Sequence, residues 1–154
     1  ILDAVELVNE QQKGLFVQQI LTHFGSDLSG RSFALWGLAF KPDTDDMREA
    51  PSLTVIRGLQ AAGAEIHAHD PAAKETAYAE LGDTLTYHDD PYACLEGADA
   101  LILLTEWSVY REQDWTEIAQ RLKGVRVYDG RNLWNADDVE SAGLRYAGIG
   151  RPSV

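Results

Sequence analysis

The sequence predicts an α/β fold in which an open, mostly parallel sheet is covered by helices on both faces. Short apolar segments alternate along the chain with segments whose apolar residues recur at helical spacing. The segment 33–40 is apolar throughout, as expected for a strand that is buried on both sides. The length of 154 residues is enough for one compact domain with its own core and short for two. Together these observations predict a single domain built on right-handed βαβ units.

The first predicted element is a long helix over residues 1–24. Its apolar side chains recur at roughly helical spacing, and Gly25 suits the end of a helix. At 1.5 Å per residue this helix would be about 35 Å long, which is more than one small domain requires. Its polar middle, residues 9–14, suits a helix that begins in a preceding domain and ends by packing on this one.

The remaining elements alternate in order. The segments 65–70, 84–88, 100–105, 125–129 and 144–150 are predicted strands, because each is a short run rich in apolar, β-branched or aromatic residues. The segments between them are predicted helices: 51–62, which opens on a proline, then 72–81, 91–98, 114–122 and 135–142. No internal repeat or low-complexity linker interrupts this alternation.

Composition and charge exclude several classes of function. No apolar run approaches the ~20 residues that span a bilayer. The 25 acidic against 13 basic residues, a net charge of −12, argue against nucleic acid and anionic membranes as partners. The chain opens on Ile1 without a secretion signal, so we expect a fragment of a cytoplasmic protein. Its single cysteine, Cys94, cannot form an internal disulfide, and we expect it to pack in the core.

Basic residues follow two predicted strands at the edge where open α/β sheets bind ligands. The loop 37–50 lacks the three glycines of a dinucleotide-binding turn, which argues against a self-sufficient NAD site. It carries Lys41 and Arg48 instead, close to a helix start at Pro51 whose free backbone N–H groups attract anions. Arg131, in the turn after another strand, adds a second guanidinium at the same edge. These cations favour a site for a phosphorylated ligand.

An alternative interpretation of the same loop stays open. Lys41 and Arg48 would then only pair with acidic neighbours on a solvated surface. Those neighbours are Asp43, Asp45, Asp46 and Glu49. The charge pattern of the loop does not separate the two interpretations, and only the second basic strand end favours the ligand site.

Other candidate residues suit structural roles better. His67 and His69 alternate on one predicted strand, but no cysteine or third histidine nearby completes a metal site, so we expect no bound metal. Asp70 stands where a dinucleotide-binding domain keeps its ribose-binding acid, but without the glycine loop we expect a helix-capping or turn role before Pro71. Cys94 has no activating base next to it in sequence, which argues against a nucleophile.

The four tryptophans are expected mostly in the core. They are Trp36, Trp107, Trp115 and Trp134. Trp107 directly follows a predicted strand, so it is the one we expect to line the ligand site.

Four motifs occur in an order that is typical of one protein family. They are "GLAFKPDTDDMREAPS" at 37–52, "GADALILLTEW" at 97–107, "DGRN" at 129–132 and "YAGIGR" at 146–151. With these motifs the chain resembles the C-terminal, nucleotide-sugar-binding domain of the UDP-glucose/GDP-mannose dehydrogenase family. The resemblance covers about residues 1–151, since "AVELVNEQQK" also resembles the end of that family's long connecting helix. It implies a Rossmann-like domain over 25–154, preceded at 1–24 by the C-terminal part of the connecting helix.

The resemblance implies an enzyme that oxidises UDP-glucose to UDP-glucuronate in two NAD-dependent steps, with an intermediate held on a cysteine. The family's N-terminal NAD domain and its catalytic cysteine motif have no counterpart in this sequence, so we expect the chain alone to be inert and to contain no catalytic residue. Carried over by position, Phe40 and Lys41 would line the UDP-sugar site and Arg131 would reach the nucleotide part. Arg48 would face the NAD held by the missing domain. We expect the complete enzyme to be a homodimer or a larger homo-oligomer.

Two alternatives stay open at this point. The chain is the same domain of a UDP-N-acetylhexosamine or GDP-mannose dehydrogenase, or it is a stand-alone Rossmann-like binding module. A glycine-rich strand-turn-helix upstream in the full gene would argue against the stand-alone module.

Overall fold

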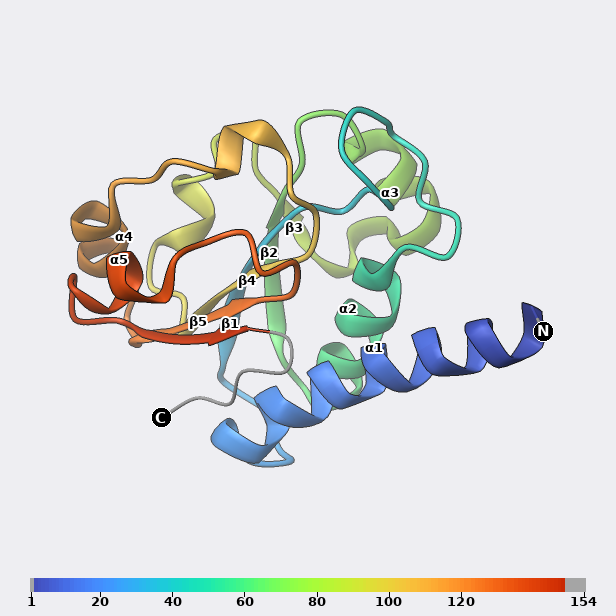
Figure 1. Ribbon diagram of the computed structural model, residues 1–154, viewed down its shortest axis with the longest axis horizontal. Coiled ribbons are helices and arrows are strands. Elements are labelled where there is room, and N and C mark those ends of the chain that lie inside the picture. Colours follow the sequence, from blue (N-terminus) through green and yellow to red (C-terminus); the bar gives the residue numbers. More distant parts are fainter. Residues whose placement is uncertain (1, 149–154) are drawn as a thin grey trace.

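The structure, a computed structural model, describes the backbone of residues 2–148 and the side chains of residues 13–148. Within these residues the chain forms an open sheet of six parallel strands in the spatial order β3-β2-β1-β4-β5-β6 (Figure 1). The strands are β1 (Ser32–Trp36), β2 (Glu65–His69), β3 (Thr86–Tyr87), β4 (Ala100–Leu103), β5 (Arg126–Asp129) and β6 (Arg145–Gly148). The predicted α/β class is therefore confirmed, and every described strand pair is parallel.

Helices cover both faces of this sheet (Figure 1). On one face lie α1 (Leu2–Phe24), α2 (Pro51–Ala61) and α3 (Lys74–Leu81), and on the other lie α4 (Trp115–Arg121) and α5 (Ala136–Glu140). Three short 3₁₀ helices complete the chain: η1 (Gly82–Thr84), η2 (Ala93–Leu95) and η3 (Ser108–Tyr110). Among the described residues, no helix combines the length and apolar character that crossing a membrane requires.

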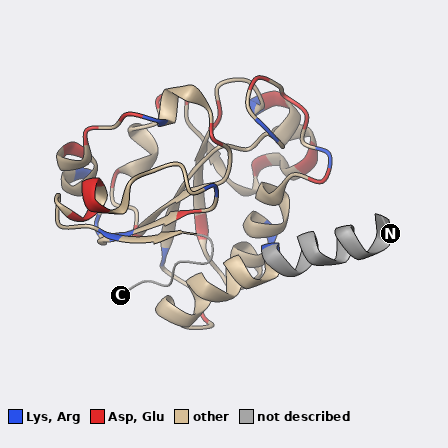
Figure 2. Cartoon of the chain, viewed as in Figure 1, with Lys and Arg blue, Asp and Glu red and all other residues tan. Residues whose placement is uncertain are grey.

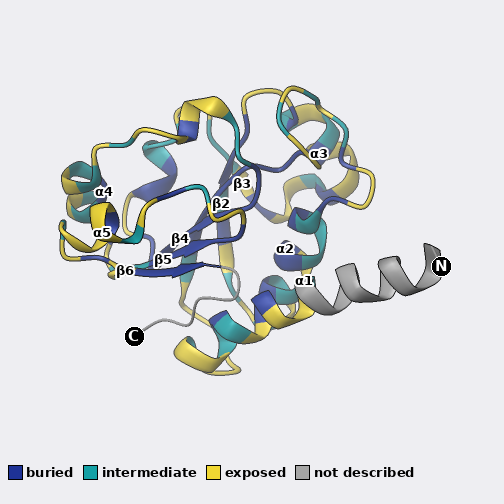
Figure 3. Ribbon diagram, in the orientation of Figure 1, coloured by how far each residue is buried: buried dark blue, intermediate teal, exposed yellow. Residues whose placement is uncertain are grey.

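The sheet separates two hydrophobic cores (Figure 3). Alternate side chains of β1 enter opposite cores: Phe33 and Leu35 pack toward α1 and α2, whereas Ala34 and Trp36 pack toward α4 and α5. Because successive side chains of a strand point to opposite faces, a strand with a core on each side must be apolar at every position. The continuous apolar run in the sequence has this cause.

The first predicted strand, residues 33–40, is too long, because β1 ends at Trp36. Gly37 turns the chain away from the sheet with φ = +96°, a conformation that favours glycine. A Cβ on Gly37 would also lie 2.5 Å from the side chain of Thr105. Leu38 and Ala39 are still buried, so the apolar run continues past the strand into the start of a loop.

One further expectation differs from the structure, and two others fall outside the described residues. The predicted helix 91–98 contains only the 3₁₀ turn η2, since Pro91 opens the segment and Gly97 ends it with φ = +71°. The predicted continuation of the last strand to residue 150 lies outside the described residues. The apolar side chains expected on the first helix at residues 2, 5 and 8 also lie outside them.

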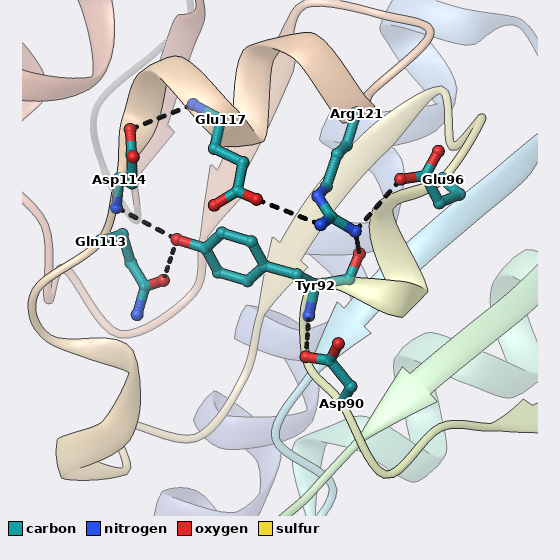
Figure 4. A network of polar contacts seen from close by, with 7 residues as sticks. All are labelled: Asp90, Tyr92, Glu96, Gln113, Asp114, Glu117 and Arg121. Atoms are coloured by element: carbon teal, nitrogen blue, oxygen red, sulfur yellow. Dashed lines mark hydrogen bonds and ion pairs between the residues drawn. The ribbon is translucent and has the colours of Figure 1, made fainter.

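Tyr92 and Arg121 fasten α4 to the segment that precedes η2 (Figure 4). The Tyr92 hydroxyl accepts a hydrogen bond of 3.0 Å from the backbone N–H of Asp114, the N-cap residue of α4. Arg121 lies over the Tyr92 ring and forms ion pairs of 3.1 Å with Glu96 and Glu117. The far end of the loop after β4 is therefore held against the segment around η2.

Candidate functional site

The strand order reverses between β1 and β4. In open α/β sheets ligands bind at this point, beyond the carboxyl ends of the strands. Among the described residues, five loops leave the sheet at this edge: residues 37–50 after β1, 70–73 after β2, 88–92 after β3, 104–114 after β4 and 130–135 after β5. All the candidate ligand residues of the sequence lie on the first and last of these loops.

Asp70 joins the loops after β1 and β2. Its side chain is buried, and Oδ1 accepts hydrogen bonds of 2.8 Å from the backbone N–H groups of Ala72 and Ala73, just before α3. Oδ2 accepts hydrogen bonds from the N–H groups of Leu38 and Ala39, at 2.7 and 2.9 Å. The predicted turn role before Pro71 is confirmed. The link to the loop after β1 could not be seen in the sequence.

The loop 37–50 is folded on itself rather than loosely solvated. The N–H of Phe40 donates to the carbonyl of Asp46 at 2.8 Å, and the Met47 side chain is buried in the core. The Ser52 hydroxyl at the start of α2 donates to the carbonyl of Leu38 at 2.6 Å. The Thr105 hydroxyl from the end of β4 donates to Ala39 at the same distance. The two ends of the loop are therefore tied to each other, and its start is tied to the residues that follow β4.

Backbone strain is concentrated in the two candidate loops. Among the described non-glycine residues, positive φ values occur at Asp43, Glu49 and Asn132, between 53° and 68°. The first lies between Lys41 and Arg48, the second follows Arg48 directly, and the third follows Arg131 directly. Strained backbone persists where the surrounding structure over-determines it, and such positions cluster at ligand sites.

Arg48 and Lys41 stand in different surroundings. Arg48 forms a forked ion pair with Asp46, in which Nη2 lies 2.8 Å from Oδ2 and Nε lies 3.1 Å from Oδ1. Its side chain is nevertheless 89% exposed. Lys41 is exposed, and the residues that the structure describes give it no ion pair or hydrogen bond. The solvated-loop interpretation expected both cations to pair with acidic neighbours, and only Arg48 does so.

The pair formed by Asp46 and Arg48 changes the acidity of both groups. The Arg48 side chain donates to Asp46 and, with the Arg48 backbone N–H, lowers the pKa of this carboxyl from 3.8 to about 2. The same contact raises the pKa of Arg48. At neutral pH the guanidinium is therefore held charged, with its fork turned toward Asp46.

Arg131 is held by a residue that the sequence did not identify, Glu106. Nε and Nη2 of Arg131 lie 2.9 and 2.8 Å from Oε2 of Glu106, which follows β4. Behind this pair, the buried carboxylate of Asp129 accepts hydrogen bonds from the N–H groups of Arg131 and Trp134 and from the Tyr146 hydroxyl, at 2.8 to 3.0 Å. A glutamate at one strand end and an arginine at the next are the signal that could have suggested the pair.

The structure places the predicted ligand residues at one edge but on two separate supports. Phe40, Lys41 and Arg48 lie on the loop after β1, whereas Arg131 lies on the turn after β5. One strand, β4, separates these supports, so at ~4.8 Å per strand they are about 10 Å apart. Phe40 is 46% exposed, which leaves its ring open to a ligand.

The tryptophans lie as predicted, mostly in the core. Trp36 and Trp134 are buried, and Trp115 is half-buried. Trp107 is half-buried and donates from Nε1 to Oδ2 of Asp70 at 3.2 Å, at the edge of the candidate site. That Trp107 lines the ligand site stays a prediction.

The histidines and the cysteine have structural partners. Nδ1 of His67 lies 2.9 Å from Nε2 of His88, and Nδ1 of His69 lies 2.8 Å from the buried Tyr110 hydroxyl. Cys94 is buried, and burial raises the pKa of its thiol to about 12. Within the described part of the chain, no three His, Cys, Asp or Glu residues are placed to hold a metal ion.

Positive charge is sparse on this chain, and acidic residues are spread over α4, α5 and the loops (Figure 2). Against a net charge of −12, Lys41, Arg48 and Arg131 put three cations at one edge of the sheet. Among the described residues, Arg48 and Arg131 are each paired with a carboxylate, and Asp43, Asp45 and Glu49 share the loop of Lys41, so this edge carries no excess of positive charge. It offers an anion individual donors, namely the exposed ammonium of Lys41 and the guanidinium groups of the two arginines.

Comparison with known proteins gives one consistent result. The model of the UDP-glucose/GDP-mannose dehydrogenase family, UDP binding domain, matches residues 34–136. A UDP-glucose 6-dehydrogenase of Pseudomonas aeruginosa is 45% identical over 99% of this chain, and the match spans 35% of that protein. The chain thus corresponds to about a third of the length of the curated relatives it matches.

Solved structures agree in fold as well as in sequence. A UDP-glucose dehydrogenase from Pyrobaculum islandicum superposes with a TM-score of 0.79 at 38% identity, covering 96% of this chain and 31% of that one. An NDP-N-acetyl-D-galactosaminuronic acid dehydrogenase from Methanosarcina mazei superposes with a TM-score of 0.74 at 27% identity, covering 93% and 29%.

Proposed function

Because the chain belongs to the UDP-glucose/GDP-mannose dehydrogenase family, as its UDP-binding domain, we propose that it serves a UDP-glucose 6-dehydrogenase. That enzyme oxidises UDP-glucose to UDP-glucuronate and uses two NAD. The observation that carries the proposal is the 45% identity to a UDP-glucose 6-dehydrogenase over nearly the whole chain. In this proposal residues 25–154 bind the nucleotide sugar, and residues 1–24 end the helix that connects them to the rest of the enzyme.

The division of labour follows from what this chain offers. Phe40 presents an exposed ring and Lys41 an exposed ammonium, so together they suit a sugar nucleotide with its diphosphate. Arg131 offers the nucleotide part a guanidinium whose Nη1 is not used by Glu106. No residue of this chain is assigned to catalysis. The N-terminal NAD domain and the catalytic middle domain would supply the reacting groups.

The described residues argue against an NAD site formed by this chain alone. The N–H groups of Leu38 and Ala39, at the turn where a dinucleotide-binding domain holds pyrophosphate, are bonded to Asp70. Arg48 fits a more limited role, since its exposed fork can contact an NAD held by another domain. NAD, when bound there, accepts the hydride, and Arg48 only helps to orient it.

A second substrate class has a specific observation in its favour. The Methanosarcina protein named for an N-acetylgalactosaminuronic acid superposes nearly as well as the Pyrobaculum UDP-glucose dehydrogenase. A UDP-N-acetylhexosamine or GDP-mannose is therefore the alternative substrate. The higher identity to the UDP-glucose enzymes, 45% and 38% against 27%, supports UDP-glucose.

We further propose that the complete enzyme is cytoplasmic and forms a homodimer or a larger homo-oligomer. Sedimentation of the complete enzyme would test its oligomeric state.

Calorimetry on the purified chain tests the proposed ligand. UDP and UDP-glucose should bind weakly, because the chain offers one part of a shared site, and more tightly than GDP or NAD. Arg131→Ala should weaken UDP binding at least tenfold. The matched control is Arg57→Ala, which removes an exposed arginine that only approaches Glu80 at 3.9 Å on the surface. Tighter binding of GDP or NAD than of UDP would overturn the assignment.

A further inference from the structure

Five hydrogen-bond donors converge on the carboxylate of Asp70. Four are backbone N–H groups, two from the loop after β1 and two from the loop after β2. The fifth is the indole N–H of Trp107, from the loop after β4. All five bonds are 2.7 to 3.2 Å long. The residues that the structure describes give this buried carboxylate no cationic partner, so N–H dipoles alone balance its charge.

A ring of N–H dipoles is how proteins hold phosphate groups. In a dinucleotide-binding domain with this strand order, the turn after β1 and the start of the next helix hold the ligand's pyrophosphate. Here the first N–H groups of that turn, at Leu38 and Ala39, are directed at Asp70. The helix α2 does not start until Pro51. The N–H donors of an anion-binding site are therefore present, and the side chain of Asp70 occupies them.

Capping of a neighbouring helix does not account for this arrangement. Asn135 shows what capping alone requires in this chain, since its side chain accepts from the N–H groups of Asp137 and Asp138 just inside α5. Asp70 makes the equivalent local bonds and adds three donors from two other loops. These additional bonds tie together the edges of the switch point between β1 and β4.

We propose that Asp70 is a specificity-determining residue. Its carboxylate occupies the backbone N–H groups at the ends of β1 and β2 and so keeps ligand phosphates from binding to them. A second anion would find its donors occupied and a negative charge beside them. The diphosphate of a ligand is then left to the side-chain cations Lys41, Arg48 and Arg131. The identity of that ligand rests on the proposed function, but the filled anion position does not.

The test is to empty the position and offer it other anions. In Asp70→Ala, formate and inorganic pyrophosphate should each restore stability, which is followed by urea unfolding. An anion that binds only the folded chain divides the unfolding constant by 1 + [L]/Kd, about elevenfold at ten times Kd. Formate should leave the wild type unchanged, and neither anion should restore the helix-cap variant Asn135→Ala.

A second arm locates the pyrophosphate. In the double variant Asp70→Ala with Lys41→Ala, stabilisation by pyrophosphate should persist, because backbone donors do not depend on Lys41. Its loss would place the anion on the side-chain cations and overturn the proposal. Rescue by formate alone would also overturn it, because the position would then admit a carboxylate but no phosphate.

If Asp70→Ala does not fold unaided, the yield of refolding with and without each anion replaces the urea midpoint. Asp70→Ser is a second variant, in which the serine hydroxyl accepts hydrogen bonds from some of the donors. No gain from either anion in either variant would contradict the proposal. Because neither arm uses UDP, these outcomes are independent of the calorimetry that tests the proposed function.

Discussion

Arg131 and Arg48 both face a carboxylate, but the regions that carry them are built differently. Arg131 pairs with Glu106, 25 positions away on the end of the neighbouring strand, and its side chain is 35% exposed. Arg48 pairs with Asp46, two positions away in the same loop, and its side chain is 89% exposed. The first pair fixes its arginine relative to the sheet. The second fixes its arginine only relative to the loop.

This difference indicates which ligand each arginine suits. A contact that is held to two strand ends is preorganised, so it suits a ligand that settles on the domain itself. A contact held by a local pair on an exposed loop suits a group that arrives from outside the domain. The proposed roles, nucleotide sugar at Arg131 and NAD at Arg48, follow this division.

The largest expected effect comes from the buried support behind Arg131. Asp129→Ala should lower the free energy of unfolding by about 3–5 kcal/mol, because it leaves two N–H groups and the Tyr146 hydroxyl without their charged acceptor. Urea unfolding monitored by tryptophan fluorescence measures it. The control Glu112→Ala removes an exposed acid and should change stability by less than about 0.5 kcal/mol. Equal losses in the two variants would mean that the turn after β5 is not anchored as described.

Kinetics in the complete dehydrogenase should separate the roles of the two arginines. Lys41→Ala and Arg131→Ala should each raise KM for UDP-glucose about ten- to hundredfold, the usual effect of losing a charged hydrogen bond. Arg48→Ala should raise KM for NAD by a similar factor and leave that for UDP-glucose unchanged. Arg48→Lys keeps the charge without the planar fork and should recover little if the contact is bidentate. Unchanged kinetics in all three alanine variants would restore the solvated-loop interpretation.

Double-mutant cycles on stability should show the same contrast on a smaller scale. The coupling between Glu106 and Arg131, tested with Glu106→Gln and Arg131→Met, should be about 1 kcal/mol, since the pair is partly shielded from water. The cycle between Asp46 and Arg48 should show a smaller coupling, because water and salt screen an exposed pair. A larger coupling in the exposed loop than between the strand ends would reverse the comparison.

The sequence predicted those parts of the fold that depend on local pattern. The buried strands were evident because each needs apolar residues on both faces, and Pro51 marked the start of α2. The end of the first strand was missed, because Gly37 leaves the sheet in response to a close approach of Thr105 from β4. A contact between residues 68 positions apart leaves no periodic signal.

In the candidate site, too, the sequence predicted the local features and missed the contacts between distant residues. The basic residues were evident as single positions, and the pair of Asp46 and Arg48 lies within one short motif. The partners of Arg131 and the donors of Asp70 come from other strand ends, so they appear only when the topology places those ends together. The family resemblance assigned roles to individual residues. It did not indicate which carboxylates hold them.

The smallest expected effect is a shift in the pKa of Asp46. It tests whether the ion pair between Asp46 and Arg48 persists in solution. The pKa of Asp46 is lowered from 3.8 to about 2, chiefly by the Arg48 side chain and next by its backbone N–H. Because the folded-state value lies below the unfolded one, any stabilisation from the pair is complete above about pH 4 and disappears as the pH falls toward 2. Titration of the Asp46 carboxyl by NMR should therefore give a value below 3.8 in the wild type. In Arg48→Ala it should move back toward 3.8, and in the control Arg57→Ala it should not move. If Asp46 already titrates near 3.8 in the wild type, the guanidinium is not held by its loop, and Arg48 would not be oriented toward an incoming NAD.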